Sequence, residues 1–145
     1  MFHEIFDWTT HHDSAGSHYV VPSGDSIWAQ VTYRARDNSY NMDMRSLKTG
    51  QRALFNYKLS AAQSATESTA YFVLEHQPNR CSQLPPNGIV TWSNISVEVN
   101  GKKVEAPRFR AEQESPVCGS KVEIVSPSEI TLTWDAAQEA VEEAA

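Results

Sequence analysis

The stretch Ile27-Trp28-Ala29-Gln30-Val31-Thr32-Tyr33 decides the fold class of this chain. Its apolar residues recur at every second position, so Ile27, Val31 and Tyr33 lie on one face of an extended backbone. The β-branched and aromatic residues in it also favour a pleated strand. We therefore predict a β-strand over residues 27–33.

The same pattern continues on both sides of this strand. Further strands are predicted over residues 41–47, 53–59, 70–75, 89–99, 121–125 and 129–134, and Phe2 to Trp8 resembles the interior of another. Turn-forming residues separate them: Lys48–Gln51, Ser126–Ser128, and Asn100-Gly101, a pair that favours a type I′ hairpin. Loops are predicted over residues 14–17, 61–68 and 77–88. Many short strands at short intervals are typical of an antiparallel β-sandwich or barrel.

The length and the net charge of the chain indicate how many domains it has and which kinds of partner it can bind. The 145 residues suit one domain, which we place at residues 1–134, followed by an acidic Ala/Glu-rich tail at residues 135–145. The tail carries four acidic and no basic residues, so of the net charge of −6 only −2 remains on the body. This chain has no basic surface for nucleic acid or anionic lipid. It has no apolar run of about 20 residues to cross a membrane, and no signal peptide at its start.

The cysteines and histidines favour no metal site. Cys81 and Cys118 are too few for a zinc site, and they form either a disulfide in a secreted protein or two reduced thiols. His11, His12 and His18 lie close in sequence, but adjacent histidines on a loop do not easily converge on one ion. Asn94-Ile95-Ser96 is an N-glycosylation tripeptide and weakly favours the secretory route.

The stretch Ala70-Tyr71-Phe72-Val73-Leu74-Glu75 ends an apolar strand on a carboxylate. The pleat sends Glu75 and Tyr71 to one face and Phe72 to the other, where Phe72 is expected in the core. A glutamate partly desolvated beside an aromatic ring has a raised pKa and can exchange protons at acidic pH. Taken alone, the pattern is a weak signal, because a glutamate at the end of a strand is more often structural or solvated.

The order of four segments points to a family. Gly24–Ile27, Leu47–Gln51, Ala70–Glu75 and Gly88–Asn94, in this order, resemble the C-terminal part of the eqolisins, the fungal glutamic peptidases. The resemblance covers roughly residues 2 to 104. Phe6-Asp7-Trp8 matches an aromatic-Glu-Trp motif of the family, with Asp7 shorter by one methylene than the family's glutamate.

The resemblance implies a secreted acid endopeptidase on a concanavalin A-like antiparallel β-sandwich, with a peptide or protein substrate. Glu75 would be catalytic, first as general base on a water and then as general acid toward the leaving amine. A glutamine amide would stabilise the oxyanion. Phe6, Asp7, Trp8 and Tyr71 would bind substrate, and no metal or cofactor takes part.

The family's glutamine has no counterpart here, because none of the five residues before Phe6 is Gln. We therefore expect an incomplete sandwich and a truncated, inactive member, with self-association at exposed sheet edges or a separate N-terminal chain. The alternative is a non-catalytic concanavalin-like module that binds peptide or glycan. In that hypothesis tryptophans such as Trp8 and Trp28 stack on sugars.

Overall fold

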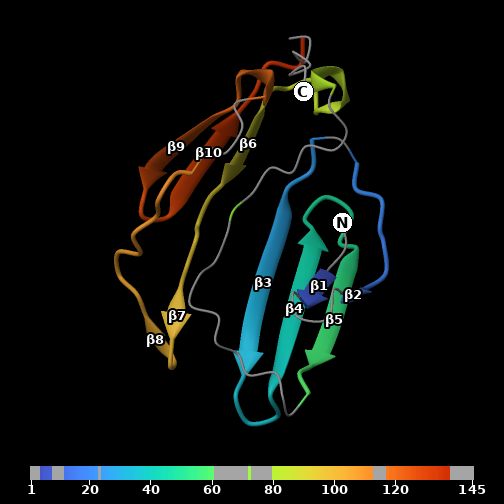
Figure 1. Ribbon diagram of the computed structural model, residues 1–145, viewed down its shortest axis with the longest axis vertical. Helices are drawn as coiled ribbons and strands as arrows, with labels where there is room; N and C mark the ends of the chain where they lie inside the picture. Colours follow the sequence, from blue (N-terminus) through green and yellow to red (C-terminus); the bar gives the residue numbers. More distant parts are fainter. Residues whose placement is uncertain are drawn as a thin grey trace. The chain divides into compact units, whose positions relative to one another are not determined.

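The computed structural model describes residues 4–7, 12–22, 24–60, 72, 80–112 and 117–137 (Figure 1). These residues are almost entirely β, with ten strands in antiparallel sheets and two short 3-10 helices. The predicted all-β antiparallel fold is thereby confirmed. The chain divides into two compact units, Met1–Thr69 and Ala70–Ala145. The assignment of residues 1–134 to one domain stays a prediction.

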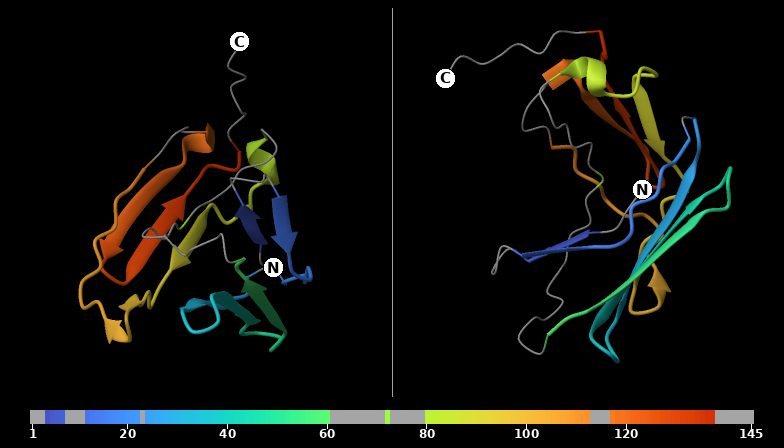
Figure 2. Two further views of the ribbon diagram at one scale, coloured as in Figure 1. Left: turned by 60° about the horizontal axis from the view of Figure 1, so that its bottom comes forward. Right: turned by 90° about the vertical axis from the view of Figure 1, so that its right-hand side faces the viewer.

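The first unit is built on a three-stranded sheet. Its strands are β3 (Ile27–Arg34), β4 (Ser39–Ser46) and β5 (Arg52–Lys58). They run antiparallel in the order β3-β4-β5, so β4 lies in the middle (Figure 1), and Figure 2 gives two further views of the strands in the same colours. The turns hold Asn38 and Gly50 at positive φ, the left-handed conformation that these two residues adopt most readily. The predicted strand at residues 27–33 and the predicted hairpin around Lys48–Gln51 are both confirmed.

The register separates an apolar face from a polar face. Val31 stands opposite Met42, and Met42 stands opposite Phe55, so residues of like character align across the three strands. The apolar face comprises Ile27, Ala29, Val31, Tyr33, Tyr40, Met42, Met44, Ala53, Phe55 and Tyr57. On this face Met42 and Ala53 are buried, whereas Val31 is 67% exposed.

A hairpin precedes this sheet in the same unit. Strand β1 (Glu4–Asp7) pairs with β2 (His12–Ala15), with Glu4 opposite Ala15. The loop predicted at residues 14–17 is therefore wrong at its start, since Ser14 and Ala15 belong to β2. Gly16 follows directly and lies against the Phe55 ring, where an added Cβ would be 3.5 Å away. The hairpin end thus packs on the apolar face at β5.

The second unit holds another three-stranded sheet. It consists of β6 (Ile89–Trp92), β9 (Lys121–Ser126) and β10 (Glu129–Thr133), in the order β6-β10-β9. A small hairpin joins β7 (Glu98–Val99) to β8 (Lys102–Lys103). Asn100 and Gly101 have φ of 52° and 71°, as the predicted type I′ turn requires.

The predicted long strand over residues 89–99 is wrong, because it divides into β6 and β7. The break falls at Asn94, whose φ of 55° is left-handed and cannot continue a pleated strand. The apolar alternation changes phase at this point, from Val90 and Trp92 to Ile95, Val97 and Val99, so the sequence carried a sign of the break that the prediction missed.

The second unit has its core at one end of the sheet. Cys81 and Cys118 form a disulfide with an S–S distance of 2.06 Å, and each belongs to a short 3-10 helix, η1 (Cys81–Gln83) and η2 (Val117–Gly119). Leu84 and Trp134 are buried against it. The Trp134 indole N–H donates to the carbonyl of Pro85 at 2.9 Å. Of the two states that the sequence allowed for the cysteines, the structure shows the disulfide.

Candidate functional site

Most of the predicted site residues lie outside the described part of the chain. Glu75, Tyr71 and Trp8 are among those outside it. Phe6 and Asp7 belong to β1, where their backbones pair with Asp13 and His12. The assignment of these residues to a catalytic and substrate-binding site therefore stays a prediction.

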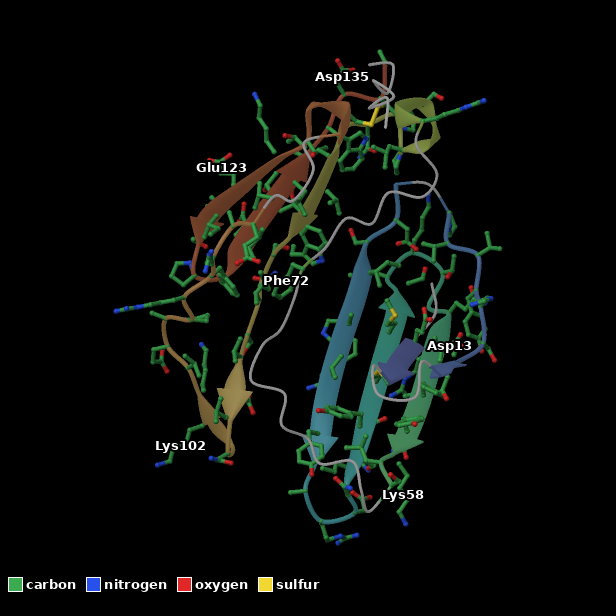
Figure 3. All side chains as sticks on the ribbon, in the orientation of Figure 1. Asp13, Lys58, Phe72, Lys102, Glu123 and Asp135 are labelled. Carbon is green, nitrogen blue, oxygen red and sulfur yellow. A yellow bond between two sulfur atoms is a disulfide. The ribbon has the colours of Figure 1, made fainter. Side chains whose placement is uncertain are left out.

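Phe72 is the one described residue of the stretch that carries Glu75. Its ring lies 5.9 Å from that of Trp92 and 5.8 Å from that of Phe109, both in edge-to-face geometry. The side chain is half-buried (Figure 3). Phe72 thus makes the aromatic contacts of a packing residue, with Trp92 on β6 as a partner, but it does not belong to the buried core around Trp134.

Two of the segments that carry the family resemblance meet in the first unit. The Asp25 carboxylate accepts the Ser46 hydroxyl, the Ser26 backbone N–H at 2.7 Å and the Lys48 backbone N–H at 2.9 Å. Ser46 is 1% exposed and accepts the Thr49 hydroxyl at 2.6 Å. The Ser46 hydroxyl is the main reason that the pKa of Asp25 lies below its ordinary value. These segments therefore close a turn, and Asp25 is an ionised acceptor rather than a proton carrier.

The polar face of the same sheet holds a charged cluster that the sequence analysis missed. Arg52 donates twice to Asp43, from Nε at 2.7 Å and from Nη2 at 2.6 Å, and Arg45 approaches the same carboxylate at 3.4 Å. The Arg45 guanidinium lies 5.3 Å from the centre of the Trp28 ring. Arg52 holds the pKa of Asp43 below its ordinary value.

This cluster does not supply a general base. Asp43 is ionised and already accepts bidentate hydrogen bonds, so it has no tendency to take a proton near neutral pH. The available signal was the register of the predicted hairpin, which sets Arg52 diagonal to Asp43 on one face. Trp28, 40% exposed beside Arg45, is the described tryptophan that a ligand can reach.

The second unit contains a cavity of about 480 Å³ beside its core. It is lined by Ser82, Leu84, Pro86, Gly88, Trp134 and residues 135–137. Among the described residues that line it, Asp135 is the one ionisable side chain, and these residues do not form the paired groups that acid–base chemistry needs. Trp134 is buried in the core and is not available to stack on a sugar.

Among the residues that the structure describes, no group of three or more His, Cys, Asp or Glu side chains is placed to hold a metal ion. No helix within those ranges has the length and apolar character needed to cross a membrane.

Antiparallel sheets with almost no helix define a protein of the all-β class, and one solved β-sandwich peptidase shares this fold. The chain is similar to the crystal structure of aspergilloglutamic peptidase from Aspergillus niger, with a TM-score of 0.61 and 20% identity. The match covers 88% of this chain and 76% of that one. Neither a protein-family model nor a curated protein matches the sequence. The likeness confirms the resemblance to the glutamic peptidases at the level of the fold.

Proposed function

We propose that this protein is a glutamic-type acid endopeptidase with peptide or protein substrates. Its cleavage depends on an oxyanion-stabilising glutamine, which these residues do not supply at the family's position. The observation that carries the proposal is the fold shared with aspergilloglutamic peptidase over 88% of the chain. The ordered segments from Gly24 to Asn94 that resemble the eqolisins support it independently of the coordinates.

In this proposal Glu75 is the general base and later the general acid. Phe72 packs on Trp92 and Phe109, which supports the assignment of this stretch to the second unit. An extended backbone there would turn Tyr71 and Glu75 away from that aromatic cluster. The carboxylate would then take a proton from the attacking water and deliver it to the leaving amine.

Substrate binding is assigned to Phe6, Asp7, Trp8 and Tyr71. The aromatic members of this set would supply apolar contact area along the peptide. The Cys81–Cys118 disulfide supports a secreted protein, because structural disulfides persist in oxidising compartments.

The test is proteolysis by the complete gene product at acidic pH, with an unfolded protein as substrate. Glu75→Gln keeps the shape of the side chain and removes the base, so kcat/KM falls by about 10²–10⁴. The matched control is Glu123→Gln, a similar change at an exposed position on β9, which leaves the rate unchanged. Cleavage that survives Glu75→Gln contradicts the catalytic assignment.

A second candidate is a non-catalytic module that binds peptide or glycan. The exposed Trp28 ring beside Arg45 favours it, since an aromatic ring with a polar rim is suited to both ligand classes. Absence of cleavage by the wild-type protein, together with peptide or glycan binding that Trp28→Ala abolishes, would establish this function in place of the first.

A further inference from the structure

Asn94 stands at a bend after β6 and is neither the proposed catalytic residue nor a member of the proposed substrate-binding set. Its φ of 55° is left-handed, a conformation that asparagine tolerates better than most residues. Its side chain is exposed. Within the described ranges, its amide makes no hydrogen bond. The amide nitrogen is therefore free to carry a substituent.

The sequence around it forms an acceptor tripeptide for N-linked glycans. Asn94-Ile95-Ser96 is the one Asn-x-Ser/Thr tripeptide without proline in the 145 residues. The Ile95 backbone N–H donates to the Ser128 carbonyl at 3.0 Å, which holds the middle residue on the β9–β10 turn. Asn94 and Ser96 on either side remain exposed.

The core of this unit lies at the other end of the sheet. Thr133 pairs with Ile89 there, and the Asp135 backbone N–H donates to the Cys118 carbonyl at 2.8 Å. The four residues of β6 separate the two ends by roughly 13 Å, at about 3.3 Å per residue. A large polar substituent on Asn94 therefore disturbs neither the disulfide nor the cavity beside Trp134.

The disulfide is the independent observation that favours this chemistry. Cys81 and Cys118 are 1% and 3% exposed, so their bond is a buried structural element and is not a transient surface link. Such bonds form in the compartments where proteins also meet the glycosylation machinery.

We propose that Asn94 carries an N-linked glycan. Asn94 Nδ2 bonds to C1 of the first sugar of a lipid diphosphate-linked oligosaccharide. The bond from C1 to the diphosphate oxygen breaks, the lipid diphosphate leaves with the electron pair, and Nδ2 loses one proton. The proposal does not depend on the catalytic role of Glu75.

The first test is peptide mapping of the protein from the cells that make it. The tryptic peptide over residues 81–102, released from its disulfide, carries a glycan mass that an amidase removes, leaving aspartate at position 94. An unmodified peptide, with the Cys81–Cys118 bond closed, overturns the proposal.

The second test compares variants secreted from a yeast host. Asn94→Asp removes the acceptor nitrogen and keeps a residue that tolerates positive φ. Ser96→Ala removes the acceptor hydroxyl, and Ser96→Thr retains it. We expect the amidase-sensitive mobility shift in the wild-type chain and in Ser96→Thr, and its loss in the other two. A shift that survives Asn94→Asp assigns the modification elsewhere and refutes the site.

Discussion

The Arg52 guanidinium donates two hydrogen bonds to the Asp43 carboxylate, from Nε at 2.7 Å and from Nη2 at 2.6 Å. Asp43 is only 7% exposed, although it lies on the polar face of the β3-β4-β5 sheet. Arg45 and Arg52 form ion pairs with Asp43, and their positive charge offsets the free-energy cost of burying its carboxylate.

Replacement of Arg52 by lysine should lower the unfolding midpoint more than replacement of Arg45. Lysine cannot reproduce the bidentate geometry, whereas Arg45 makes a single 3.4 Å contact with Asp43. Urea unfolding of Arg52→Lys and Arg45→Lys measures the difference. An equal loss in both variants would mean that the bidentate geometry contributes nothing.

The same pair should make stability depend on pH. Arg52 lowers the pKa of Asp43 below its ordinary value of 3.8 in the folded state. A carboxyl group whose pKa is lower in the folded than in the unfolded protein stabilises the fold. This stabilisation is fully present at pH values above the pKa of the unfolded protein, and it is lost as the pH falls through the pKa of the folded protein. The stability gap between wild type and Asp43→Asn should be constant above pH 3.8 and shrink below it. Urea midpoints measured across this range test the sign.

Loss of the Cys81–Cys118 disulfide should be costly. The bond joins residues 37 positions apart, and constraint of a loop of that length corresponds to about 4 kcal/mol. The double variant Cys81→Ser/Cys118→Ser leaves no unpaired thiol and is compared with wild type in guanidinium. A change below about 1 kcal/mol would mean that the core around Trp134 holds without the bond.

Gly88→Ala should destabilise the second unit. Gly88 has a φ of +66°, and a Cβ there would lie 2.8 Å from the Trp134 carbonyl oxygen. Gly101 is the matched control, with a φ of +71° and nothing within 4 Å. Both variants carry backbone strain of about 1–3 kcal/mol, and Gly88→Ala adds the clash. Equal losses in thermal unfolding would exclude a role for the close contact.

Phe72 and Trp92 should be energetically coupled. Their edge-to-face contact at 5.9 Å predicts about 0.5–1.5 kcal/mol beyond simple burial. A double-mutant cycle with Phe72→Leu and Trp92→Leu measures it. If the losses of stability in the two single variants add up to the loss in the double variant, the Phe72–Trp92 contact contributes no coupling energy.

Much of the fold could be predicted because strands and turns have recognisable patterns over short stretches of sequence. Apolar alternation and turn-forming residues are patterns that span only a few positions. They predicted the strand over Ile27–Tyr33 and the hairpins at Lys48–Gln51 and Asn100-Gly101. The interruption at Asn94 was not predicted, although the apolar alternation changes phase between Trp92 and Ile95, because the whole stretch is rich in strand-forming residues. Phe72 as a packing residue was predicted from the pleat, and Glu75 as a catalytic residue stays a prediction.

The sequence by itself determined the strand-and-turn order and the candidate acid–base residue, Glu75, through patterns that each span a handful of residues. Only the tertiary structure decided that Asp43 meets Arg52, that Cys81 pairs with Cys118, and that Trp134 closes a core beside Gly88. These contacts depend on sheet register and on chain segments up to 46 residues apart, Gly88 to Trp134. Local propensity does not encode a register, because a shift of one residue reverses every side chain while leaving the pattern unchanged.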